Sequence, residues 1–138
     1  MSDFPIAIYH NPDCGTSRNA LAMIEAAGYR PTVVEYLKVG WTRAQLDRLL
    51  ADMRLRPRDL LREKGTPAAK LGLLDPAASD ATILAAMIEH PILVNRPIIV
   101  TPKGAALCRP SEEVLKLLDR LPEQFVKEDG EVVPIGSS

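Results

Sequence analysis

The start of the chain places a strand, a helix and a second strand in succession, and this order restricts the possible folds more than any other feature. Residues 6–9 form a short apolar and aromatic run of strand length, and residues 32–36 are rich in β-branched side chains. Between these runs, apolar residues at positions 20, 21, 24 and 27 recur at helical spacing, and Gly28 predicts the end of that helix. A crossover of this length favours two parallel neighbouring strands with a right-handed connection.

The middle of the chain predicts a group of helices. Thr42 and Gln45 form a capping box at the start of one helix, and Asp80 is expected to cap another. The second helix should end near His90, because the proline that follows disfavours the α conformation in the residue before it. Between them lies a stretch rich in Pro, Ala and Gly, in which only residues 60–62 have a helical pattern.

A β-hairpin and a final helix are predicted towards the C-terminus. Residues 98–101 and 105–109 are the predicted strands on either side of a Gly-containing turn, and Ser111 begins a helix through Leu118. The tail after Pro122 is polar and weakly patterned. We therefore predict one α/β domain over residues 1–138, with a mixed sheet flanked by helices and a helical insertion before the C-terminal hairpin. This order of elements resembles that of thioredoxin-like domains.

The composition disfavours several classes of protein. Lys and Arg number 17 against 18 Asp and Glu, and the net charge of −1 does not supply the basic field of a nucleic-acid-binding protein. No apolar run approaches the ~20 residues of a membrane-spanning helix, and the first residues lack the basic start and apolar core of a signal peptide. Two cysteines are too few for a disulfide scaffold, and the Cys and His residues lack paired metal-ligand spacing. We expect a cytoplasmic monomer without nucleic-acid, membrane or metal partners.

Cys14 lies in a polar loop between the first predicted strand and the first predicted helix. The unpaired N–H groups and the dipole at a helix start stabilise a thiolate, so we predict a pKa for Cys14 below that of an ordinary cysteine. Gly15 would allow close approach of the backbone to a ligand. Polar atoms around the first turn come from Thr16, Ser17 and Asn19, and His10 and Arg18 would favour the thiolate if they face it. The alternative, a small buried apolar cysteine, fits poorly with such polar and turn-prone neighbours.

Spacing separates this loop from two other thiol chemistries. A C-x-x-C dithiol site would need a cysteine where Ser17 stands, and a C-x5-R phosphate loop would need an arginine where Ala20 stands. A second thiol must then come from Cys108 or from outside the protein. Cys108 precedes Arg109 on a predicted strand, and neighbouring side chains on a strand point to opposite faces. If Arg109 faces the site, Cys108 faces the core, which favours an external thiol.

Three stretches, residues 9–19, 90–102 and 107–112, together with a shorter match at residues 60–62, resemble the glutaredoxin-linked arsenate reductases. The matches follow one another in the same order and extend over the chain from about residue 6 to residue 118. The resemblance implies a thioredoxin-like fold in which a cysteine attacks arsenate and three arginines hold the oxyanion. The corresponding residues here are Cys14, Arg62, Arg96 and Arg109, with His10 beside the thiol.

The resemblance also implies the remaining features of the site. Forked guanidinium donors suit a tetrahedral oxyanion better than point-charge ammonium groups do. A cis peptide bond is expected before Pro97, where thioredoxin-like folds place a cis-proline opposite the active-site helix. Glutathione would be the co-substrate and a glutaredoxin the protein partner, and we expect no tightly bound cofactor.

Two other functions remain open on the sequence alone. One is a thioredoxin-like regulator that binds RNA polymerase, although the related regulators carry C-x-x-C at the position that Ser17 interrupts. The other is a thiol reductase that acts on a substrate other than arsenate. The set of three arginines argues against this second alternative.

Overall fold

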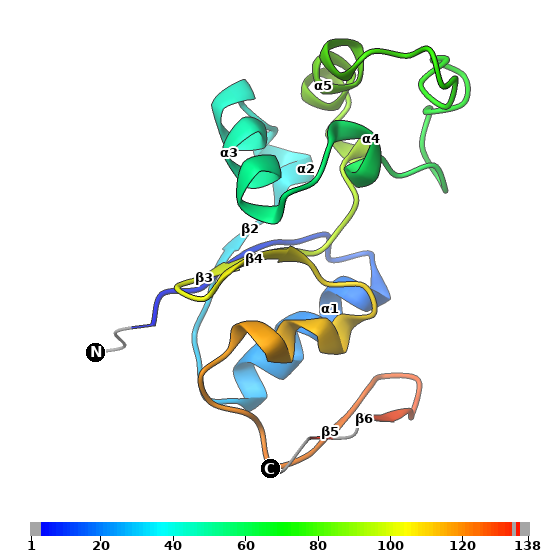
Figure 1. Cartoon of the computed structure of the whole chain (residues 1–138). Helices are drawn as coiled ribbons and strands as arrows, with labels where there is room; N and C mark the ends of the chain where they lie inside the picture. Colours follow the sequence, from blue (N-terminus) through cyan, green and yellow to red (C-terminus); the bar gives the residue numbers. More distant parts are fainter. Residues whose placement is uncertain (1–3, 134, 136–138) are drawn as a thin grey trace. The chain divides into compact units, whose positions relative to one another are not determined.

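The computed structural model describes residues 4–133 and residue 135, and the chain divides into two compact units (Figure 1). The sheet unit contains the residues up to 35 and those from 96 onwards, and the helical unit contains residues 36–95. The assignment of residues 1–138 to one domain remains a prediction. Within the described part of the chain, every helix is too short or too polar to cross a membrane.

A four-stranded mixed sheet forms the centre of the sheet unit. Its strands are β1 (Ala7–Tyr9), β2 (Thr32–Val34), β3 (Ile98–Thr101) and β4 (Gly104–Leu107). The strand order is β2-β1-β3-β4, with β1 parallel to β2 and the other pairs antiparallel. The predicted crossover, mixed sheet and hairpin are therefore confirmed. The second predicted strand is shorter than expected, because the chain leaves the strand after Val34.

Helix α1 (Gly15–Ala26) and the 3-10 helix η2 (Ser111–Leu117) pack together on the sheet (Figure 1). Their core includes apolar side chains from β1, α1, β3 and η2, among them Ile8, Met23, Ile24, Ile99 and Val114. We predicted an α-helix from Ser111 to Leu118, and the structure corrects this to a 3-10 helix. The buried residues 111, 114 and 117 recur every three positions, which is the 3-10 period.

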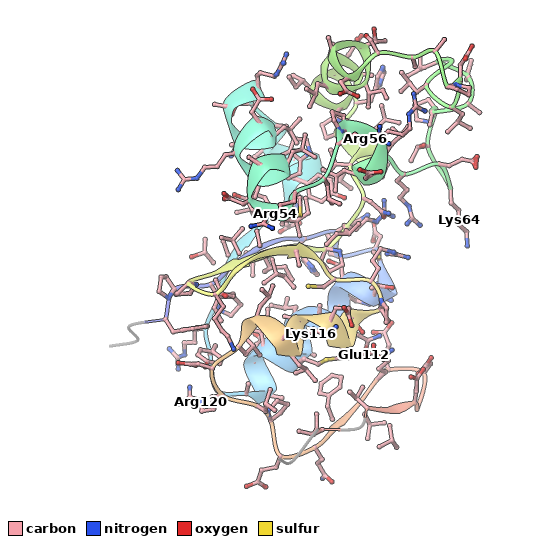
Figure 2. The ribbon with its side chains drawn as sticks, in the orientation of Figure 1. Arg54, Arg56, Lys64, Glu112, Lys116 and Arg120 are labelled. Carbon is pink, nitrogen blue, oxygen red and sulfur yellow. The ribbon has the colours of Figure 1, made fainter. Side chains whose placement is uncertain are left out.

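The C-terminal end of α1 is held by residues from far along the chain. Gly28 follows the helix with φ of 96°, a conformation that favours glycine, as the predicted helix end requires. Arg120, labelled in Figure 2, donates from Nε to the Ala27 carbonyl at 2.8 Å, and its guanidinium lies 4.7 Å from the centre of the Tyr29 ring. The Tyr29 hydroxyl in turn donates to Asp119. These contacts fix α1 at the end opposite to Cys14.

The helical unit contains α2 (Tyr36–Val39), α3 (Arg43–Met53), α4 (Pro57–Leu60), α5 (Asp80–Glu89) and the 3-10 helix η1 (Pro91–Leu93). It forms the predicted insertion between β2 and β3. Helix α2 was not predicted. The buried Tyr36, which we placed in a strand, instead begins this helix and donates its hydroxyl proton to the Val94 carbonyl at 3.0 Å.

Two helix starts in this unit test the capping predictions. The capping box of Thr42 and Gln45 is present: the Thr42 hydroxyl accepts the Gln45 N–H at 3.1 Å, and the Gln45 side chain accepts the Thr42 N–H at 2.9 Å. The cap of α5 is Ser79, which accepts the Thr82 N–H at 3.1 Å. Asp80 is the first helical residue, so that prediction was wrong by one position. Both residues suit a helix start, and the serine oxygen makes the bond.

The helical pattern at residues 60–62 is also corrected. Helix α4 comprises Pro57–Leu60, with the proline in the first turn, where its missing N–H costs no hydrogen bond. Leu61 pairs with Val94 as an isolated antiparallel bridge, and the Arg62 N–H donates to the Leu93 carbonyl at 2.8 Å. Leu61 is therefore extended, and Arg62 lies outside the helix, bonded to the segment before β3.

The tail that we described as weakly patterned forms a second, small hairpin. Strand β5 (Phe125–Val126) pairs antiparallel with β6 (Val132–Val133), and Gly130 in the turn has φ of 93°. Val133 is buried in the core of the sheet unit, and Phe125 packs against that core. This C-terminal hairpin therefore belongs to the sheet unit, and its turn carries Glu128.

Candidate active site

Cys14 occupies the N-cap position of α1 at the end of a tightly bonded loop. Its N–H donates to the Asn11 carbonyl at 3.0 Å, and its own carbonyl accepts the Arg18 N–H at 2.9 Å. The Asn11 side chain accepts the Asp13 N–H at 2.9 Å, which closes the turn before the cysteine. The thiol is thus placed at the start of a helix by local hydrogen bonds, as the sequence predicted.

The surroundings of Cys14 favour its thiolate form. The residue is only 8% exposed, and this burial acts to raise the pKa of Cys14. Hydrogen bonds from the Ser17 backbone N–H and from the side chains of Arg96 and Arg109 outweigh burial, so the pKa of Cys14 lies below its ordinary value. The lowered pKa agrees with the sequence prediction and makes Cys14 a candidate nucleophile, because the thiolate is the reactive form of a cysteine.

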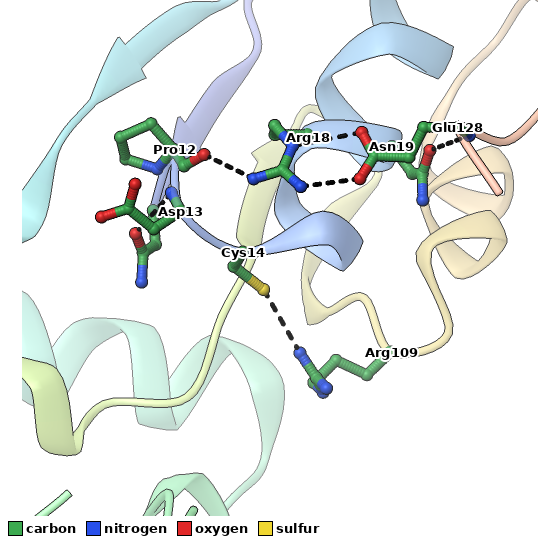
Figure 3. Close-up of polar contacts among 8 residues, drawn as sticks. Pro12, Asp13, Cys14, Arg18, Asn19, Arg109 and Glu128 are labelled. Atoms are coloured by element: carbon green, nitrogen blue, oxygen red, sulfur yellow. Dashed lines mark hydrogen bonds and ion pairs between the residues drawn. The ribbon is translucent and has the colours of Figure 1, made fainter. Parts of the chain in front are cut away.

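Arg109, which comes 95 positions later in the chain, points at the Cys14 thiol (Figure 3). Its Nη1 lies 3.8 Å from Cys14 Sγ and also donates to the Arg96 carbonyl at 2.9 Å. Arg96, which is 8% exposed, comes just before β3, and Arg109 comes just after β4. The hairpin of β3 and β4 therefore brings two of the predicted arginines to Cys14.

The Arg96–Pro97 peptide bond is cis, which confirms the prediction. The Arg109–Pro110 bond is also cis, which we did not predict. The Pro97 carbonyl accepts the Cys108 N–H at 2.9 Å, and so extends the pairing of the hairpin by one bond beyond its strands.

Cys108 lies in the core of the sheet unit. It is fully buried among apolar side chains, and burial, with a smaller contribution from Glu113, raises the pKa of Cys108 to about 12. We predicted that Cys108 and Arg109 would face opposite sides of a strand over residues 105–109. The observed strand ends at Leu107, so both residues lie beyond it. Nevertheless, the Cys108 side chain lies in the core and the Arg109 side chain points at Cys14, as predicted.

His10 and Ser17 form a buried pair beside the loop. His10 Nδ1 lies 2.6 Å from Ser17 Oγ, which also accepts the Asn11 N–H at 3.1 Å. Burial lowers the pKa of His10, Glu35 opposes this effect, and Arg18 adds to it. A neutral ring can accept the Ser17 hydroxyl proton at Nδ1 and carry its own proton on Nε2. His10 thus supports the thiol by bracing the loop through Ser17, and its lowered pKa argues against a role as a cation.

Gly15 and Thr16 are half-buried in the first turn of α1. A side chain at Gly15 would place its Cβ 3.1 Å from Glu128 Oε1. The carboxylate of Glu128 thus lies close to the backbone at Gly15, and the approach of a ligand there remains a prediction. Sequence reasoning missed this residue, because nothing in the pattern of the tail connects it with α1.

Arg62, the third predicted arginine, belongs to the helical unit. Its Nη1 donates to Asn95 Oδ1 at 3.2 Å and its Nε to the Lys64 carbonyl at 3.1 Å, and the residue is half-buried. Asn95 directly precedes Arg96 in the chain. The role of Arg62 in holding an oxyanion remains a prediction.

The described residues contain no cluster of three or more His, Cys, Asp or Glu side chains that would hold a metal ion. The groups that the structure brings together at Cys14 are its thiol and the guanidinium groups of Arg96 and Arg109. A thiolate beside two guanidinium groups can bind an oxyanion and present a nucleophile to its central atom.

Proteins with similar sequences and structures include several that are named arsenate reductases. The model of the ArsC family matches residues 9–117. Arsenate reductase ArsI1 of Synechocystis sp. is 60% identical over 134 residues, which cover 96% of this chain and 93% of that protein. Arsenate reductase of Escherichia coli (strain K12) is 51% identical over 129 residues, 93% of this chain and 92% of the relative. The solved structure of arsenate reductase from Vibrio cholerae has a TM-score of 0.80 and 39% identity, covering 85% of this chain and all of that one.

Proposed function

Because this chain belongs to the ArsC family, we propose that it reduces arsenate to arsenite, with Cys14 as the nucleophile and glutathione and a glutaredoxin as the source of electrons. Relatives named arsenate reductases match more than nine-tenths of the chain at 51% and 60% identity. The single observation that carries the proposal is the contact of a thiol of lowered pKa with Arg109 Nη1 at 3.8 Å. The proposed nucleophile, Cys14, therefore lies beside a guanidinium group that would bind the oxyanion.

The first step is attack on arsenic. Arsenate carries negative charge on a tetrahedral set of oxygens, and the guanidinium groups of Arg96 and Arg109 bind those oxygens beside the thiolate. The Cys14 sulfur forms a bond to arsenic(V), and one arsenate oxygen takes up protons and leaves as water. The arginines stabilise the negative charge that remains on the adduct. Arg62 is proposed as the third donor on the strength of the family resemblance.

The second stage supplies two electrons. The thiol of glutathione displaces a further oxygen as water and forms an arsenic–sulfur bond. A glutaredoxin thiolate then attacks the glutathione sulfur, which yields a mixed disulfide and leaves the electron pair on arsenic, now arsenic(III). Hydrolysis of the remaining sulfur–arsenic bond releases arsenite and restores the Cys14 thiol.

A thiol that resolves the Cys14 adduct could come from two positions within this chain, and neither position suits that role. The fourth position of a C-x-x-C motif is Ser17, whose hydroxyl bonds with Asn11 and His10. The other cysteine, Cys108, is fully buried, and its pKa of about 12 leaves almost no thiolate near neutral pH. Neither position therefore supplies a thiol that would resolve the Cys14 adduct.

The test is arsenite production from arsenate by the purified protein with glutathione and a glutaredoxin. Activity should disappear with Cys14→Ser, and it should fall when either glutathione or the glutaredoxin is omitted. Cys108→Ser is the matched control and should retain substantial turnover. Loss of turnover in folded Cys108→Ser would show that the resolving thiol is internal, and an inactive wild-type protein that binds RNA polymerase would favour the regulator.

A further inference from the structure

Arg18 connects the loop before Cys14 with the C-terminal hairpin (Figure 3). Its Nη1 donates to the Pro12 carbonyl at 2.8 Å, two residues before the cysteine. Its Nη2 and Nε donate to the two carboxylate oxygens of Glu128, at 2.7 Å and 3.1 Å. One guanidinium therefore holds a backbone carbonyl of the thiol loop and a carboxylate from a distant segment at the same time.

The hairpin that carries Glu128 is itself fixed to the sheet unit. The Glu128 N–H donates to Asn19 Oδ1 at 3.1 Å, and Lys127 Nζ pairs with Glu112 Oε1 at 2.8 Å. Phe125 and Val133, on the two strands, pack on the core of that unit. The carboxylate is thus held over the first turn of α1, where it would lie 3.1 Å from a Cβ at position 15.

Glu128 and the Cys14 thiolate are two negative charges at one helix start. A helix N-terminus stabilises an anion, but two anions there repel each other, and each disfavours ionisation of the other. Arg18, which contacts Glu128, has the opposite effect on both. The interaction of Arg18 with Cys14 also helps to raise the pKa of Arg18, after the larger effect of Glu128.

We propose that Arg18 and Glu128 are positioning residues of opposite effect, through which the C-terminal hairpin sets the reactivity of Cys14: Arg18 promotes the thiolate and Glu128 restrains it. The proposal concerns the thiol itself and holds whether or not arsenate is the substrate. The titratable and charged groups around the thiol in the sheet unit are His10, Asp13, Arg18, Arg96, Arg109 and Glu128. Arg96 and Arg109, which flank the hairpin of β3 and β4, are unchanged in every variant below, so their effect cancels in the comparison.

The experiment measures the rate of alkylation of Cys14 by iodoacetamide, a neutral reagent, as a function of pH in the full chain. The midpoint of that profile should move to higher pH in Arg18→Gln and to lower pH in Glu128→Gln. At a pH below the wild-type midpoint, each rate should differ about two- to fivefold from wild type, the size expected for a charge near a helix terminus. The double variant should lie closer to wild type than Arg18→Gln does, and 1 M salt should shrink all the differences.

Shifts of the alkylation midpoint in opposite directions in the two single variants distinguish this role from a purely structural one. If the pair only fastens the hairpin, both single variants break the same contact, and their midpoints move together or not at all; either result overturns the proposal. The two side chains are 45% and 46% exposed, so both variants are expected to fold, which thermal unfolding checks. Arg43→Gln and Asp47→Asn, which break a similar exposed pair with bonds of 3.1 Å and 3.2 Å on α3, are matched controls and should leave the midpoint unchanged.

Discussion

Cys14 and Cys108 both belong to the sheet unit and both are buried, with exposed fractions of 8% and 0%, yet their surroundings affect the thiols in opposite directions. Burial raises the pKa of Cys108 to about 12, because the side chains around it are apolar. Burial also acts against the Cys14 thiolate, but one backbone N–H and two guanidinium groups outweigh it. The comparison shows that burial alone does not decide the reactivity of a cysteine. The hydrogen-bond donors around the sulfur decide it.

The largest expected effect is the difference in alkylation rate between the two thiols of the native protein. Near neutral pH, Cys14 should react at least about a hundredfold faster than Cys108, since the gap in thiolate fraction exceeds the gain in nucleophilicity of the more basic thiolate. Mass spectrometry of the labelled peptides after short exposure to iodoacetamide measures both rates. Equal rates in the folded protein would contradict the comparison, and equal rates after unfolding are the control.

Removing a donor from Cys14 should make that thiol more like Cys108. Arg109→Ala removes the guanidinium whose Nη1 lies 3.8 Å from Cys14 Sγ. We expect the pKa of Cys14 to rise and kcat/KM for arsenate to fall about ten- to hundredfold, the range for loss of a hydrogen bond to a charged group. Arg109→Lys should recover only part of the loss, because an ammonium lacks the forked donor geometry. Unchanged alkylation profiles and kinetics in both variants would show that Arg109 does not act on the thiol.

The smallest expected effect is on the free energy of unfolding. The two cysteines should make this free energy depend on pH in opposite directions. Cys108 has a raised pKa in the folded protein, so above the ordinary thiol pKa of about 8.5 the unfolded chain loses a proton that the native state keeps. The free energy of unfolding should therefore fall with rising pH above that value, by up to about 1.4 kcal/mol per pH unit, from this group.

Cys14 has a lowered pKa in the folded protein, so its ionisation stabilises the fold above the ordinary thiol pKa. This stabilisation is lost as the pH falls through the pKa of Cys14 in the folded protein. Urea unfolding of wild type, Cys108→Ala and Cys14→Ser between pH 6 and about pH 10 separates the two contributions. The alkaline decline should be weaker in Cys108→Ala, and the loss towards lower pH should be weaker in Cys14→Ser. The same slopes in all three proteins would count against the opposite shifts.

Local patterns in the sequence were sufficient for much of the fold. The capping box of Thr42 and Gln45 and the hairpin before Arg109 depend on residues that are close neighbours in the chain, and the crossover from β1 to β2 depends on the succession of strand, helix and strand. The errors in the predicted helix and strand boundaries also come from the use of local patterns alone. Ser79 and Asp80 are equivalent capping candidates in sequence, and only the observed bond to Thr82 chooses between them.

The site was predicted less completely than the fold. The position of Cys14 at a helix start follows from its neighbours, and the family resemblance brought in Arg62, Arg96 and Arg109. The neutral state favoured for His10 did not follow, because it depends on burial and on a hydrogen bond with Ser17. No pattern in the sequence indicated that Glu128 lies near the site, since its partner Arg18 is 110 positions away in the chain.

By itself, then, the sequence determined where the strands and most helices form, which cysteine begins a helix, and which family the chain resembles, because these depend on side-chain periodicity and short motifs. The tertiary structure alone decided that residues 111–117 adopt a 3-10 helix against the sheet, that burial favours the neutral form of His10, and that Glu128 reaches the helix start beside Cys14. The physical reason is that exclusion of water and the partners of a charged group come from segments far apart in the chain. No local pattern records those contacts.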